Sequence, residues 1–163
     1  KIPFVEQDMR KLALHRPQDA IICACDGVNY LDSLKAAEEF FEAANAALKV
    51  GGLLLFDISS QYKLENILGC NTFAEDEQGG AYIWKNNYDP KSRLIEMNLT
   101  FFERQGELYR RFTERHIQRA HSVDELLSAL NRAGFDAEAY DFETMDPVKP
   151  DSERVQFSGR KRR

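Results

Sequence analysis

The stretch "LKVGGLLLFDIS", Leu48 to Ser59, decides which fold the chain is expected to adopt. From Gly51 onward it is a continuous apolar run closed by polar residues, and "DAIICACD", Asp19 to Asp26, is a second run of this kind. Runs that are apolar on both faces suit strands of a buried parallel sheet. Gly51 and Gly52 permit the positive φ that a helix-to-strand turn often needs. We therefore predict two parallel strands, with the glycines as a structural turn at the start of the second.

The segment between the two runs is predicted to be an amphipathic helix. Its apolar residues recur at steps of three and four: Leu31, Leu34, Ala37, Phe40, Phe41, Ala44 and Leu48. Strand, helix and strand form a βαβ unit, whose crossover should be right-handed. The opening stretch "FVEQDMRKLAL", Phe4 to Leu14, has the pattern of an apolar strand with a polar tip. We predict that it pairs beside this unit as a further parallel strand.

The character of the chain changes between Ala81 and Gln118, where aromatic and β-branched residues are frequent. The runs "AYIWKNNYD", "RLIEMNLTFFER" and "ELYRRFTERHIQRA" are separated by Asp89-Pro90-Lys91 and Gln105-Gly106, which are hairpin signals. They predict three antiparallel strands, which form an inserted β cap over residues 61–121 of a single α/β domain covering residues 1–163.

The helical period resumes after this insertion. Ser122-Val-Asp-Glu125 is a capping-box pattern and Gly134 is placed as a helix stop. "FDAEAYDF" and "ERVQFSGR" are predicted as two closing strands.

Composition indicates a globular protein with a real core: 43% of the 163 residues are hydrophobic. The net charge of −5 argues against a nucleic-acid-binding surface spread over the molecule. The odd set Cys23, Cys25 and Cys70 lacks the pattern of a disulfide framework or a zinc site, so we expect no metal and a reducing, cytoplasmic setting. No signal peptide or membrane-spanning apolar run is visible, and no membrane partner is expected.

The order of these features resembles the later part of a class I S-adenosylmethionine-dependent methyltransferase. That order is a strand ending in Asp-Met-Arg, the "DAIIC" strand, a helix, "LKVGGLLLFDIS", hairpins, a capped helix with "LNRAGF", and two strands. More narrowly, it is similar to small-molecule methyltransferases with an antiparallel insertion after the fifth strand, such as sugar-amine N-methyltransferases. The resemblance implies a Rossmann-like sheet of parallel strands with an antiparallel last strand. It also implies S-adenosylmethionine as cofactor and methyl transfer to an amine or hydroxyl of a small molecule.

The family's Gly-rich loop after the first strand, and the acidic residue after the second, have no counterpart in this chain, which opens inside a strand pattern without an initiator Met. We therefore expect a fragment of a longer enzyme. A non-catalytic interaction module, with aromatic hairpins that bind a protein partner, stays open as an alternative. An RNA methyltransferase is disfavoured by the acidic balance, and a homodimer is left open.

The resemblance assigns cofactor-binding roles to two segments. Asp8 and Met9 would lie against the adenine, although the residues alone also allow Asp8 to be a solvated strand end or an N-cap. Cys25, Asp26 and Asn29 of "CDGVNYL" would lie by the methionine part of the cofactor or by the acceptor.

Further residues are implied on the acceptor side. Tyr30 would stand beside the acceptor, or be a half-buried first turn of the helix. His116 is a candidate general base, with a satisfied structural histidine as the alternative. The acceptor pocket would be shaped by Tyr62, Trp84, Tyr88 and Arg115, of which Trp84 and the tyrosines could equally be the core of the small sheet. Asp57 could face the substrate or cap a turn.

Overall fold

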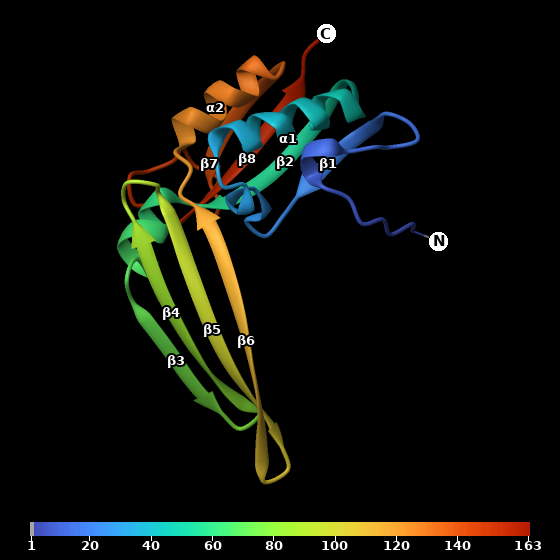
Figure 1. Ribbon diagram of the computed structural model, residues 1–163. Coiled ribbons are helices and arrows are strands. Elements are labelled where there is room, and N and C mark those ends of the chain that lie inside the picture. The colour runs from blue at the N-terminus through green and yellow to red at the C-terminus, as the bar shows by residue number, and fades with distance from the viewer. Residues whose placement is uncertain (1) are drawn as a thin grey trace.

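The main layer of the molecule is a four-stranded sheet with two helices packed on one of its faces (Figure 1). The computed structural model describes residues 2–163. The strands follow the order β1 (Gln18–Cys23), β2 (Leu48–Ser59), β8 (Arg154–Lys161) and β7 (Phe135–Asp141). β1 and β2 are parallel, whereas β8 is antiparallel to both of its neighbours. The sheet therefore has the parallel strands and the antiparallel last strand that the sequence predicts.

The main hydrophobic core lies between this sheet and the helices α1 (Leu34–Ala47) and α2 (Val123–Arg132). Phe56 of β2 stacks on Phe157 of β8 with ring centroids 4.7 Å apart, and Phe41 of α1 packs against Phe56. Both helices begin at side-chain caps, because Ser33 accepts from the Ala36 amide and Ser122 forms the predicted capping box. The sequence placed both helices and the α2 cap correctly.

The second sheet is formed by β3 (Thr72–Glu77), β4 (Gly80–Asp89), β5 (Leu94–Gln105) and β6 (Leu108–Arg119). All neighbours are antiparallel, and the sheet extends from the main layer as a curved arm (Figure 1). Three of its strands match the predicted runs, and β3 was missed. The sequence "TFAEDE" ends in acidic residues that are poor strand formers, and all its side chains but Phe73 are exposed. β3 thus gives no alternating apolar signal.

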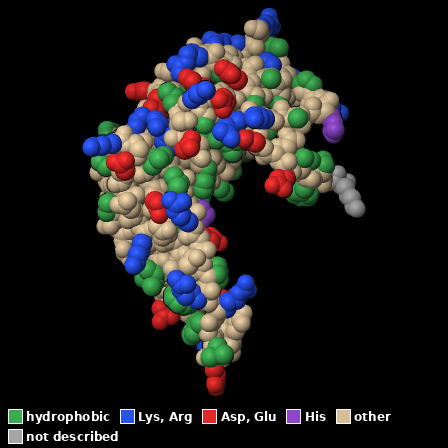
Figure 2. Space-filling view, viewed as in Figure 1, with side chains coloured by type: hydrophobic (Ala, Val, Ile, Leu, Met, Phe, Trp, Pro, Cys, Tyr) green, Lys and Arg blue, Asp and Glu red, His purple; other side chains and the backbone are tan. Residues whose placement is uncertain are grey.

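A separate small core holds the root of the second sheet. Between β2 and β3 the chain forms η3 (Lys63–Leu68), a single wide helical turn. Its Leu64 and Leu68 pack with Ile95, Met97 and Ala120. The curved arm and the main layer leave the inner side of the molecule hollowed (Figure 2).

The start of β2 differs from the prediction. The strand begins at Leu48, directly after α1, and Gly51 lies inside it with φ +78°. The register to β1 jumps from Gln18 opposite Leu48 to Ala20 opposite Leu53. Gly51 therefore belongs to a bulge within the strand, and the predicted helix-to-strand turn at the glycines is wrong, because α1 runs into the strand at Leu48 without a glycine turn.

The opening stretch is not a strand, so the prediction of a further parallel strand over Phe4–Leu14 is wrong. Residues 2–8 have no regular structure, and η1 (Met9–Lys11) is one short 3₁₀ turn. Phe4 and Val5 are 93% and 71% exposed. A strand needs a neighbour for its backbone hydrogen bonds, and β2 is the one strand that pairs with β1 in the described part of the chain. Of the stretch, Met9 and Leu12 do pack against the main core.

Candidate active site

A cavity of about 310 Å³ opens at the carboxyl ends of β1 and β2, where the second sheet meets the main layer. This end of an α/β sheet is the usual place for ligand binding. Its lining combines polar side chains with apolar ones: Asp26, Tyr30, Ser59, Lys63, His116, Gln118 and Arg154 are polar, and Leu68, Trp84, Met97 and Leu99 are apolar. Other hollows lie at the free end of the second sheet and are lined by aromatic and acidic side chains without a nucleophile or histidine.

Tyr30 and His116, the two predicted catalytic residues, meet at the mouth of this cavity. Tyr30 ends η2 (Gly27–Tyr30), the short 3₁₀ turn that follows β1, and His116 lies on β6. The Tyr30 hydroxyl is 3.0 Å from His116 Nδ1, and His116 Nε2 is 3.1 Å from a carboxylate oxygen of Glu114. With the imidazole proton on Nε2, the ring donates to Glu114 and accepts from Tyr30. The three groups form a hydrogen-bonded chain that can pass a proton.

Asp26 is the acidic group of the cavity. One of its carboxylate oxygens accepts from Gln118 Nε2 at 2.6 Å, and the other lies 3.6 Å from Arg154 Nη2. Gln118, His116 and Glu114 alternate along β6 and therefore face the same side of the second sheet. The cavity lining thus includes a carboxylate, a cation and an imidazole.

Asp8 and Met9 lie beside the loop that follows β1. Asp8 caps η1 by accepting from the Arg10 amide at 2.9 Å, and the Arg10 guanidinium is 2.7 Å from the same carboxylate. The side-chain hydrogen bond from Arg10 lowers the pKa of Asp8 to about 2. Met9 is half-buried, and the end of its side chain lies near Gly27 of the loop after β1. If Gly27 carried a Cβ atom, that atom would be 3.9 Å from the Cε atom of Met9. The turn at η1 therefore borders the loop that follows β1.

These two residues fit the adenine end of S-adenosylmethionine by their chemistry. The Asp8 carboxylate is well exposed and can accept from an exocyclic amine, while Met9 offers a polarisable apolar side chain to a ring. Arg10 shares the same carboxylate, so it also orients the acceptor atoms. The structure thereby favours an orienting role for Arg10 over that of a free surface charge.

Asn29 does not face the cavity. Its side chain is fully buried, its amide nitrogen donates to the Ser59 and Arg119 carbonyls at 3.0 Å, and its oxygen accepts from the Ser59 amide. Asn29 therefore fastens β2 to the end of β6, and the structure does not bring its side chain to the cavity with Asp26 and Tyr30. Cys25, by contrast, is exposed next to Asp26.

The predicted acceptor residues separate into two groups. Trp84 lines the cavity. Trp84 and Tyr88 lie on the same face of β4 and both pack against the small core, but Tyr88 is not part of the cavity lining. Tyr62, at the start of η3, also lies outside the lining. Because side chains alternate along a strand, Arg115 lies on the face of β6 opposite to His116, 2.8 Å from Glu96, and the structure does not bring it to the cavity.

Several residues of the cavity and its surroundings were missed by the sequence reasoning. Gln118, which lines the cavity, and Glu114, which contacts His116, could have been found because they alternate with His116 along a strand. Arg154 and Lys63 have no such local signal, since they come from β8 and η3 and reach the cavity only through the fold.

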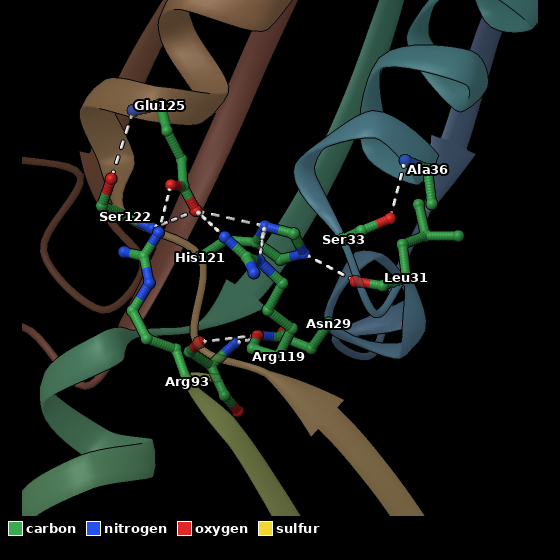
Figure 3. A network of polar contacts seen from close by, with 10 residues as sticks. Asn29, Leu31, Ser33, Ala36, Arg93, Arg119, His121, Ser122 and Glu125 are labelled. Atoms are coloured by element: carbon green, nitrogen blue, oxygen red, sulfur yellow. Dashed lines mark hydrogen bonds and ion pairs between the residues drawn. The ribbon is translucent and has the colours of Figure 1, made fainter. Parts of the chain in front are cut away.

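A buried polar network holds the loop at Leu31 (Figure 3). His121 is fully buried and lies 2.9 Å from the Leu31 carbonyl through Nε2, while its Nδ1 is 3.4 Å from Arg119 Nε and 3.3 Å from Glu125. Glu125 also pairs with Arg93 at 2.5 Å. Burial lowers the pKa of His121, which keeps the ring neutral. The network joins β5, β6, α2 and the η2 loop at one point.

Residues 2–163 contain no group of three or more His, Cys, Asp or Glu side chains that could hold a metal ion. Neither of the described helices is long and apolar enough to cross a membrane.

Known proteins with similar sequence are methyltransferases by name. No protein-family model matches the chain. Over 98% of its length the chain is 34% identical to YqeM of Bacillus subtilis (strain 168), which is provisionally named a methyltransferase. The chain spans 66% of that protein, about two thirds of its length.

Solved structures agree in fold. The crystal structure of an S-adenosylmethionine-dependent methyltransferase from Clostridium acetobutylicum matches with a TM-score of 0.90 at 32% identity, over 96% of this chain and 63% of the other. CalS10, an amino pentose methyltransferase from Micromonospora echinaspora with S-adenosylmethionine bound, matches with a TM-score of 0.73 over 94% of this chain and 63% of its own. Its 19% identity supports the fold alone. Its relatives by sequence are named as methyltransferases, its structural neighbours are S-adenosylmethionine-dependent methyltransferases, and its fold is that of class I of these enzymes.

Proposed function

We propose that the chain forms the acceptor side and the adenine end of an active site that methylates an amine or hydroxyl of a small molecule. The observation that carries the proposal is the hydrogen-bonded chain Tyr30–His116–Glu114 at a cavity beside the β1 loop. The second sheet, with η3, would cover the acceptor. A cavity of about 310 Å³ suits a small acceptor, and the chain's net charge of −5 gives no support to an RNA substrate.

The cofactor would be held at two places. Asp8 and Met9 would take the adenine, and the loop around Cys25 and Asp26 would border the methionine part. The bound cofactor supplies a methyl group on a positively charged sulfur, which is already electrophilic. The residues of this chain therefore need chiefly to align the acceptor and to exclude water.

The acceptor side would also manage a proton. A protonated amine would be attracted by Asp26 and would release a proton to His116, directly or through the Tyr30 hydroxyl, before the nitrogen can attack. Glu114 would stabilise the imidazolium that results. The apolar wall of Trp84, Met97 and Leu99 would keep water away from the reacting atoms.

A second candidate function has its own observation. The free end of the second sheet exposes Leu108, Tyr109 and Phe112, with Leu108 76% exposed, and this would suit a module that binds a protein partner. Such a module would show no cofactor affinity.

The proposal is tested by calorimetric titration of S-adenosylhomocysteine into the complete protein and into its Asp8→Ala variant. We expect binding by the parent and a Kd about tenfold higher for Asp8→Ala, which loses an acceptor for the adenine amine. A parent that does not bind would remove the methyltransferase proposal and favour the partner-binding module. Equal Kd values for parent and variant would remove only the adenine assignment of Asp8.

A further inference from the structure

The turn after β1 has an unusual backbone. Cys25 and Asp26 have φ values of 61° and 50°, so two consecutive residues with side chains are in the left-handed region. Only Arg93 and Met145 share this property among the non-glycine residues that the structure describes. Such conformations are disfavoured when a Cβ is present, and they persist where the surroundings fix them.

The group that fixes this turn is the carboxylate of Asp57. Its Oδ1 accepts from the Cys25 amide at 2.9 Å and its Oδ2 accepts from the Asp26 amide at 3.0 Å. Asp57 is 3% exposed, and its charge is balanced by Arg154, whose Nε lies 2.7 Å away. Successive amides directed at one anion form a concave anion site, which here holds a side chain of the protein itself.

The turn determines where Asp26 lies. With both amides directed at Asp57, the Asp26 side chain reaches Gln118 on β6 and lines the cavity. Arg154 contacts Asp57 and Asp26 together, so strand β8 is part of the same arrangement. A turn with ordinary φ values would direct the amides and the Asp26 carboxylate elsewhere.

We propose that Asp57 is a positioning residue for cofactor binding, which acts by holding the Cys25–Asp26 turn in its left-handed conformation. This rests on the proposed function, in which the turn borders the methionine part of the cofactor. Without the Asp57 carboxylate the turn populates several conformations, and affinity falls in proportion to the fraction that is competent to bind.

The test is a cycle of variants of the complete protein titrated with S-adenosylhomocysteine. Asp57→Asn keeps the size of the side chain but replaces one acceptor oxygen by a donor, and we expect its Kd to rise about tenfold. Cys25→Gly makes the left-handed conformation accessible without strain. In the Cys25→Gly background the effect of Asp57→Asn should therefore shrink to about threefold or less.

Asp32→Gly is the matched control, because it adds a glycine to the same loop at an exposed residue without a positive φ. In that background the effect of Asp57→Asn should remain about tenfold. Parent-like affinity of Asp57→Asn would overturn the proposal, and so would an undiminished effect in the Cys25→Gly background.

Folding is followed by circular dichroism in every variant. If Asp57→Asn fails to fold, Cys25→Gly should restore both folding and binding in the same chain, and an unfolded double variant overturns the proposal. A parent that does not bind S-adenosylhomocysteine removes the proposed function and this inference together. A binding parent with an unaffected Asp57→Asn removes this inference alone.

Discussion

The hydrogen bonds of His116 differ in kind from those of a histidine that only supports the fold. It lies between the Tyr30 hydroxyl and the Glu114 carboxylate on a strand whose adjacent side chains, Arg115 and Ile117, are exposed, and its ring forms no hydrogen bond to the backbone of the described residues. Replacing it should therefore leave the fold intact. This distinguishes it from His121, which is fully buried and bound to a backbone carbonyl.

We predict that His116→Ala lowers kcat about a hundredfold, the usual range for loss of a general base. The deficit should shrink toward pH 10, because amine acceptors with a pKa near 10 then lose their proton to solvent. The measurement is S-adenosylhomocysteine release with a panel of amino sugars and simple amines, against pH.

His15→Ala is the control, because His15 is an exposed histidine outside the cavity. Parent-like turnover of His116→Ala over the whole pH range would show that the enzyme needs no base at this position. A deficit of equal size at every pH would indicate a binding role for the imidazole.

Among the elements, those with a complete local signal were predicted correctly. The α2 helix carries its own capping box and apolar stripe, and the hairpins of β4 to β6 carry their turn residues, so each could be located without the fold. The predictions for β3 and for the opening stretch were wrong for opposite reasons: β3 was missed, and the opening stretch was predicted as a strand that does not form. β3 forms without an apolar pattern because β4 offers an edge, and the opening stretch has the pattern but no strand beside it.

The candidate site was predictable only in part for a related reason. The resemblance implied roles for Asp26, Tyr30 and His116, and the structure brings these three residues to one cavity. The contact between Tyr30 and His116 joins residues 86 positions apart and is created by the packing of η2 against β6. The sequence does not show whether the Asn29 side chain is buried or free to bind a ligand, because it is buried by contacts with the end of β6 in the second sheet.

The junction of elements around His121 makes stability depend on pH. Burial lowers the pKa of His121 below its ordinary value of 6.5, and the groups facing it are Arg119 of β6, Glu125 of α2 and the Leu31 carbonyl. The unfolded chain therefore binds a proton more readily than the folded one. The contribution of His121 to the free energy of unfolding is fully present above pH 6.5 and is lost as the pH falls below it.

We predict that urea unfolding shows a stability loss between pH 7.5 and 5.5 that is smaller in His121→Gln than in the parent. His121→Gln should also be less stable at pH 7.5, since it disturbs the bond to Leu31. His15→Gln, at an exposed histidine, should keep the parental pH dependence. A parental pH dependence in His121→Gln would show that other groups cause the loss.

At the scale of the whole molecule, the two sheets have separate cores of unequal size. The main core contains five fully buried phenylalanines, Phe40, Phe41, Phe56, Phe135 and Phe157, whereas the second sheet is held at its root by Leu64, Leu68, Ile95, Met97 and Ala120. The polar network of Asn29 and Glu125 fastens that root to the main layer. Toward its free end the second sheet has mostly exposed side chains.

Amide hydrogen exchange should therefore follow distance from the junction. Local opening costs least where few apolar contacts are broken, so we predict the slowest exchange in β2 and β8 and the fastest in β3 and the outer half of β6. Between these limits, the residues of β5 and β6 near Arg93 and Arg119 should exchange more slowly than those near the tip. His121→Gln should speed exchange at this root while leaving the already fast tip unchanged, because it weakens the network that anchors the root. Protection of β3 equal to that of β2 would show instead that the two sheets open as one cooperative unit.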